Sequence, residues 1–107
     1  MNVQWRRPLQ AETPTALPHG VERLADVWRG ARGEVLAVSP ASMAGVPEAE
    51  RDELERRLLE IGFVEGARVE VLHEGFIGRD PIAVRLDDMR VALRRREAQG
   101  VLIRLDR

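Results

Sequence analysis

The apolar residues of this chain change their spacing in its middle part. Over residues 54–61, apolar side chains recur at i, i+4 and i+7, which places them on one stripe of a helix. From Arg68 the spacing falls to two, the alternation of a β-strand. The residues that this alternation assigns to one face of the strand are Val69, Val71 and His73. The pattern therefore predicts a helix that ends at Ile61 and a strand that begins at Arg68.

Two glycines lie between that helix and that strand. Gly62 stands where a residue with left-handed backbone commonly ends a helix, and Phe63 or Val64 can then fold back onto the last helical turn. Gly66 can adopt the positive φ that a type II turn requires at its third residue. We therefore expect a tight turn at residues 65–66.

The remaining segments predict short strands around a single main helix. The helix is expected over residues 47–61, residues 21–29 should form one or two helical turns with Trp28 on the packed stripe, and residues 75–81 should be a loop. A further helical turn is expected at residues 95–100. The predicted strands cover residues 32–38, 68–74, 82–86, 89–93 and 101–105.

This order of elements indicates a mainly β fold of about five strands with one main helix between the first and second strands. An open sheet of this size would leave long apolar edges, so closure into a small, partly open barrel is favoured. Residues 1–20 contain three prolines and no periodicity, which predicts a flexible tail before a domain over residues 21–107. Trp5, in that tail, either docks on the domain or on a partner, or is simply mobile.

Composition excludes several classes of protein. The chain has no cysteine, so neither a disulfide framework nor a thiolate metal site is available, which fits a cytoplasmic location. Its net charge is −1 although all 17 basic residues are arginines, so we expect no nucleic-acid partner. No apolar run approaches the roughly 18–20 residues of a membrane span, so the protein should not be membrane-inserted. No nucleophile frame, phosphate-binding loop or dinucleotide motif is present, so we expect no enzyme and no catalytic residues.

Metal ligation is harder to judge from the sequence. The available donors are His73, Glu74, Asp80, Asp87 and Asp88. His73 and Glu74 are neighbours on a predicted strand and should point to opposite faces, so the simpler interpretation is that the acids solvate turns. No metal site is therefore predicted, although a weakly bound transition metal at the surface or between two molecules stays open.

Large apolar side chains on connections, and one basic cluster, suggest a docking surface. Phe76 and Ile77 lie in a loop flanked by glycines, while Phe63 is expected to cover the core. Phe76 and Ile77 either tuck inward or face a partner, and we hypothesise that they form a partner surface with the C-terminus of the helix. The basic cluster, Arg94-Arg95-Arg96, either meets an acidic partner or phosphate or is a solvated strand end. The candidate partner-binding residues are Phe63, Val64, Phe76, Ile77 and Arg94.

The runs LLEIGFVEGARVEVL and DPIAVRLDDMRVALRRREAQGVLI resemble the FeoA family over about residues 22–105. The shared features are the helix end Ile61-Gly62-Phe63, the turn at Glu65-Gly66, the alternating valine strand and the segment Ala92-Leu93-Arg94 followed by Ala98. Glu65 replaces the proline usual in the family, and residues 76–80 are bulkier than the family's loop.

The resemblance implies an SH3-like β-barrel and a non-enzymatic accessory protein of bacterial ferrous iron uptake. Such a protein would have no resident cofactor and would dock on the cytosolic GTP-binding domain of the membrane transporter FeoB. The alternative is a metal-responsive regulatory domain that binds iron or zinc and acts through a repressor or by forming a homo-oligomer.

Overall fold

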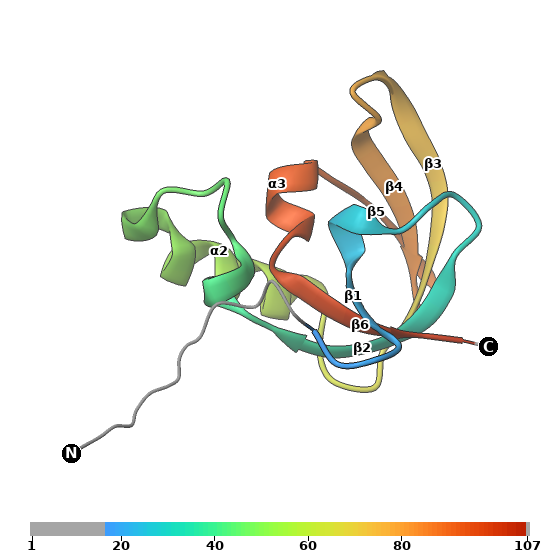
Figure 1. The fold of residues 1–107 in the computed structure, drawn as a ribbon, viewed down its shortest axis with the longest axis horizontal. Coiled ribbons are helices and arrows are strands. Elements are labelled where there is room, and N and C mark those ends of the chain that lie inside the picture. The colour runs from blue at the N-terminus through green and yellow to red at the C-terminus, as the bar shows by residue number, and fades with distance from the viewer. Residues whose placement is uncertain (1–16, 107) are drawn as a thin grey trace.

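The computed structural model describes residues 17–106, and within that range the chain forms one six-stranded antiparallel sheet. Trp5 and most of the predicted tail lie outside the described residues. The strand order is β1-β6-β2-β3-β4-β5 (Figure 1). The strands are β1 (Val21–Arg23), β2 (Arg32–Val38), β3 (Arg68–Ile77), β4 (Asp80–Leu86), β5 (Met89–Leu93) and β6 (Val101–Leu105).

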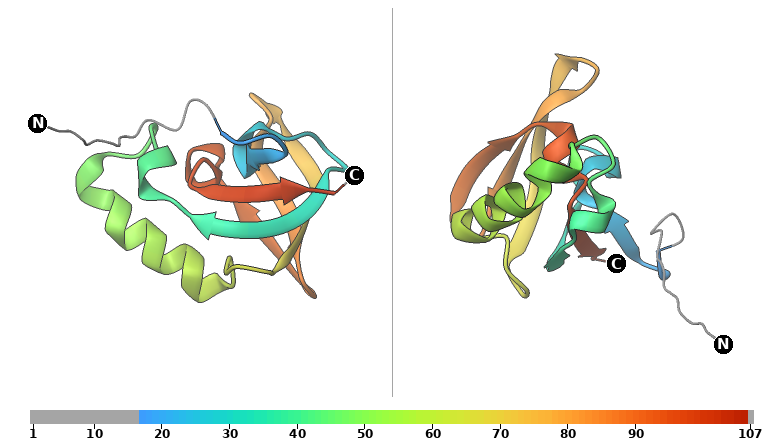
Figure 2. Two further views of the ribbon diagram at one scale, coloured as in Figure 1. Left: turned by 60° about the horizontal axis from the view of Figure 1, so that its bottom comes forward. Right: turned by 90° about the vertical axis from the view of Figure 1, so that its left-hand side faces the viewer.

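Short helical segments and one longer helix complete the fold. They are the 3-10 turns η2 (Leu24–Asp26) and η3 (Pro40–Ser42), the helix α2 (Glu48–Ile61) and the single turn α3 (Arg95–Ala98). The sheet curls on itself, and α2 lies along its outside between β2 and β3 in the chain (Figure 2). The prediction of a mainly β, SH3-like fold with one main helix is therefore confirmed, with a sixth strand added.

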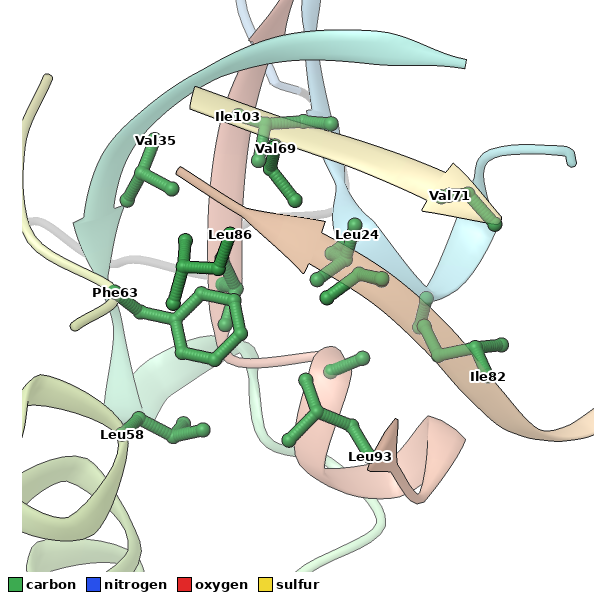
Figure 3. Close-up of a cluster of buried hydrophobic side chains, with 14 of the residues drawn as sticks. Leu24, Val35, Leu58, Phe63, Val69, Val71, Ile82, Leu86, Leu93 and Ile103 are labelled. Carbon is green, nitrogen blue, oxygen red and sulfur yellow. The ribbon is translucent and has the colours of Figure 1, made fainter. Parts of the chain in front are cut away.

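The interior of the curled sheet is filled by branched aliphatic side chains and one aromatic ring. Figure 3 shows the ring of Phe63 between Leu58 of α2 and Leu86 of β4. Phe63 is 0% exposed, so it belongs to the core and is not available to a partner. The expectation that Phe63 covers the core is confirmed, and its place among the candidate partner-binding residues is wrong, because the chain that follows the helix turns this side chain inward.

Helix α2 ends at Ile61 with Gly62 as its cap, as the sequence predicts. Gly62 has a φ of 129°, and its N–H lies 3.2 Å from the carbonyl oxygen of Leu58. The N–H of Phe63 donates to the same carbonyl at 3.0 Å. Both bonds go to the carbonyl oxygen of Leu58 in the last turn of the helix, and they direct Phe63 into the core.

The segment before β2 differs from the prediction. Residues 21–23 pair with β6 as the edge strand β1, and η2 follows in place of a longer helix. Val27 is buried while Trp28 is 58% exposed, so the helical stripe that included Trp28 does not form. Pairing with β6 satisfies the backbone of this segment in extended form, which overrides its helical spacing.

Candidate partner interface

The longest β-hairpin of the protein, made of β3 and β4, extends well beyond the barrel (Figure 1). Its tip is the two-residue turn Gly78-Arg79, where φ is 64° and 59°, as a type I′ hairpin turn requires. The expectation of a loop over residues 75–81 is therefore wrong, because both strands continue almost to this turn. Gly75 permits the close approach of the strands, since a Cβ there would lie 2.0 Å from the carbonyl oxygen of Asp80.

The two residues of β3 that precede this turn carry large apolar side chains in full contact with solvent, and we call residues 76–79 together the hairpin tip. Phe76 is exposed to 106% of its reference area and Ile77 to 88%. Burying such side chains stabilises a protein by about 1.5–3 kcal/mol each, and this fold leaves that free energy unused. The prediction had left open whether these residues turn inward, and the structure places both outside the core.

A β-bulge reverses the predicted facing of the two residues before the tip. Val71 is opposite Val84, but His73 is opposite Ala83, so β3 carries one extra residue between these pairs. His73 is exposed as a result, whereas Glu74 is opposite the buried Ile82. The expectation that His73 shares a face with Val69 and Val71 is wrong for this reason.

Glu74 holds the hairpin tip through two arginines. Its carboxylate accepts from Arg79 at 2.9 Å (Nε to Oε1) and 3.2 Å (Nη2 to Oε2), a two-point contact across the turn. The Nη2 atom of Arg95 lies 3.4 Å from Oε2 of the same carboxylate. The hydrogen bond from Arg79, with smaller contributions from the charges of Arg79 and Arg95, holds the pKa of Glu74 below its ordinary value.

Arg95 connects this hairpin to the neighbouring elements. Its backbone N–H donates to Oδ1 of Asp80 at 2.9 Å, and its Nε donates to the carbonyl oxygen of Arg79 at 2.6 Å. Its Nη1 donates to the carbonyl oxygen of Ala25 in η2. The first residue of α3 thus holds the hairpin and η2 in one arrangement, so Phe76 and Ile77 lie on a braced projection.

The structure separates the two halves of the predicted partner surface. Val64, after the helix, is 46% exposed but precedes β3, whereas Phe76 and Ile77 lie at the far end of that strand. At about 3.3 Å per residue, the ten residues of β3 span about 30 Å. The hypothesis of one surface made by the hairpin and the helix C-terminus is therefore wrong, and the apolar hairpin tip is the candidate site.

Arg94 is exposed and directly follows β5, next to Arg95, and it is not part of the hairpin itself. Its backbone N–H donates to Oε1 of Glu97 at 2.9 Å at the start of α3. The other oxygen of Glu97, Oε2, accepts from Arg57 of α2 at 3.1 Å. Among residues 17–106, the side chain of Arg94 is not in any ion pair.

Trp28 is a candidate contact residue that the sequence did not reveal. The carbonyl oxygen of the preceding residue, Val27, accepts from Nη2 of Arg79 at 3.4 Å, so this exposed indole is carried by a segment fastened to the hairpin. Trp28 stands at helical spacing from Val21 and Leu24, so the sequence predicts a buried side chain and not a surface contact residue.

The donors weighed for a metal site are dispersed. Across residues 17–106, no three His, Asp or Glu side chains are close enough together to hold a metal ion. Asp80 and Asp87 instead accept hydrogen bonds from the backbone N–H groups of Arg95 and Arg68, both at 2.9 Å. In the same part of the chain, no helix has the length and apolar character needed to cross a membrane.

A small curled antiparallel sheet with one flanking helix defines a domain of the SH3-like class. The chain belongs to the FeoA family, whose domain model matches residues 22–105. This family is associated with ferrous iron transport. No curated protein sequence matches the chain.

Solved structures support the same assignment. The FeoA protein of Chlorobium tepidum is 31% identical, with a TM-score of 0.60 over 78% of this chain and 70% of that one. FeoA of Stenotrophomonas maltophilia, determined as a zinc complex, is 30% identical, with a TM-score of 0.60 over 75% of this chain and 86% of that one. That protein is described as a prokaryotic SH3 domain protein and a candidate activating factor of ferrous iron transport.

The fold also occurs in larger regulators. A manganese-dependent transcriptional repressor is 22% identical, with a TM-score of 0.63 over 80% of this chain and 42% of the repressor. At this identity the likeness concerns the fold alone.

Proposed function

We propose that this protein is a non-enzymatic accessory protein of ferrous iron uptake that acts in the cytoplasm by docking on the GTP-binding domain of FeoB. The observation that carries the proposal is the exposure of Phe76 and Ile77 on a hairpin fastened by Glu74, Arg79 and Arg95. Large apolar side chains held outside a core are typical of the anchors of protein interfaces. The family membership supplies the process in which such an anchor would act.

A fixed hairpin favours docking because little conformational entropy is lost on binding. The turn, the ion pairs and the bonds from Arg95 already order the tip, so a partner would bury Phe76 and Ile77 without first having to fold the segment. Trp28, carried beside the hairpin, would enlarge the apolar contact area.

Replacing Phe76 and Ile77 together by alanine should weaken binding to the isolated GTP-binding domain about tenfold or more, since each removes a large buried contact in the complex. The affinity is measured by calorimetry with the domain from the same genome, and the surface by amide shifts of the isotope-labelled protein. Because both side chains are exposed, the free energy of unfolding should change by less than about 0.5 kcal/mol.

Leu59→Ala, at an exposed apolar position on α2, is the matched control and should leave the affinity unchanged. An unchanged affinity for the folded double variant would contradict the proposed site. Shifts confined to Val64 and the end of α2 would assign the docking surface to the opposite end of β3.

A second candidate function is metal-responsive regulation, for which the zinc bound to the Stenotrophomonas relative is the supporting observation. Iron(II) and zinc titrations of the same labelled sample, with the oligomeric state followed by light scattering, separate the two functions. Metal-dependent association in the absence of any effect from the GTP-binding domain would favour regulation.

A further inference from the structure

Among residues 17–106, the strand β5 lies at one edge of the sheet and pairs with β4 alone. A two-residue turn, Asp87-Asp88, joins these strands, so the adjoining pair Leu86 and Met89 is the hydrogen-bonded kind of antiparallel pair. Hydrogen-bonded and non-hydrogen-bonded pairs alternate along an antiparallel ladder, so the next pair, Arg85 and Arg90, is of the non-hydrogen-bonded kind. It follows that the backbone N–H and C=O of Arg90 and of Ala92 point to the free edge.

The outward face of the same strands carries an uncompensated positive charge. Arg85 and Arg90 are directly opposite each other, and non-hydrogen-bonded pairs bring Cα atoms to about 4.5 Å and side chains closest together. Like charges in this position destabilise a sheet. Arg85 has a distant ion pair with Glu70 at 4.0 Å, and no acid among residues 17–106 lies within ion-pair distance of Arg90.

The alternation continues to a third arginine. Ala92 is opposite Ala83 on this face, and Arg94 follows two residues after Ala92. Arg94 also has no acidic partner within ion-pair distance among the described residues. The outward face of β5 therefore carries an arginine, an alanine and an arginine in turn. Arg90 and Arg94 lie about 13 Å apart along the strand, and the small side chains of Ala92 and Ala83 lie between them.

We propose that β5 is a docking edge for an extended acidic segment of a partner protein. The segment adds a strand to the free edge through the backbone groups of Arg90 and Ala92. Carboxylates four residues apart in that strand then meet the Arg85 and Arg90 pair and Arg94, which relieves the repulsion within the pair. The proposal concerns a surface separate from the hairpin tip, and it does not rest on the identity of the transporter.

A protein segment fits this edge better than a nucleic acid does. The protein's net charge of −1 gives little attraction to a polyanion, and the strands β4 and β5 carry no aromatic residue on which a base could stack. The free backbone groups, in contrast, are matched only by another extended polypeptide.

The test uses the full chain, isotope-labelled, and a capped nine-residue peptide of alternating valine and threonine with two glutamates four positions apart. We expect amide shifts confined to residues 85–94 and slowed hydrogen exchange at Arg90 and Ala92 on binding. The same peptide with glutamine in place of glutamate should bind about fivefold more weakly, and added salt should reduce the difference. Shifts at the hairpin tip, or none, would overturn the proposal, as would equal competition by a single-stranded oligothymidylate.

Arg90→Glu distinguishes a binding residue from a merely solvated one. The substitution replaces a like-charged pair with an opposite-charged pair, so the urea midpoint of unfolding should rise while the acidic peptide loses its binding. Arg32→Glu, opposite Glu70 on the same face of the sheet but on β2, is the control away from the β5 edge and should lower the midpoint while leaving peptide binding unchanged. Unchanged peptide affinity in Arg90→Glu would refute the docking edge.

Discussion

At the scale of single residues, Gly62 and Phe63 show how local chemistry directs a side chain. The positive φ of Gly62 ends α2, and the turn that follows sends Phe63 into the core. The sequence predicts this stop correctly because a glycine after a helical stripe has a specific backbone role. It also predicts that Phe63 covers the core, and the structure buries the ring completely.

Gly62→Ala should lower the free energy of unfolding by about 1–3 kcal/mol, since a side chain at a φ of 129° is strained and its Cβ would lie 3.3 Å from Cδ2 of Leu86. Urea denaturation followed by circular dichroism measures the change. Gly30→Ala is the matched control, because Gly30 also has a positive φ but has open space around it. The free energy of unfolding should therefore fall less in this variant than in Gly62→Ala. Equal costs at the two sites would show that contact with Leu86 plays no part.

At the scale of elements, the hairpin depends on interactions that no local pattern predicts. The alternation in residues 68–74 and 82–86 predicts two strands, but the bulge that turns Glu74 toward Arg79 and Arg95 depends on the register with β4. The glycines of residues 75–78 predict a loop, yet they serve a close strand approach and a tight turn.

The order of the hairpin tip should depend on pH. The folded pKa of Glu74 is held below its ordinary value of 4.5, so the stabilisation is fully present above that value and is lost as pH falls through the folded pKa. We expect nitrogen relaxation of the amides of Phe76 and Ile77 to report a rigid tip at pH 7 and increased motion below pH 4.5.

Glu74→Gln removes the titrating group and is the control for this transition. The variant should show a mobile tip at every pH, with no transition in that range. A pH-dependent loss of order that persists in Glu74→Gln would assign the effect to another carboxylate.

At the scale of the whole molecule, the segment before β2 closes the barrel. Leu24 enters the core as the helical spacing predicts, but Val27 is buried where that spacing predicts Trp28, and Arg95 of α3 holds η2 in place. The side chain of Trp28 is exposed. The barrel is therefore completed by contacts between the two ends of the chain.

Leu24→Ala should lower the free energy of unfolding by about 2–5 kcal/mol, because it leaves a cavity in a fully buried position. Trp28→Ala should change it by less than about 0.5 kcal/mol, since the indole is exposed. Chemical denaturation of both variants measures the difference. The reverse order would mean that Trp28, and not Leu24, packs against the barrel.

The sequence by itself determined the main helix, its stop at Gly62, the approximate strands from β2 to β6 and the family, because these depend on spacing and turn residues within short windows. Only the tertiary structure decided the strand β1, the bulge before Glu74 and the separation of Val64 from the hairpin tip. Each of these depends on which distant strand supplies the opposite residue. Pairing between segments far apart in the chain is fixed by the packing of the curled sheet as a whole, and the spacing of residues within a short segment does not determine it.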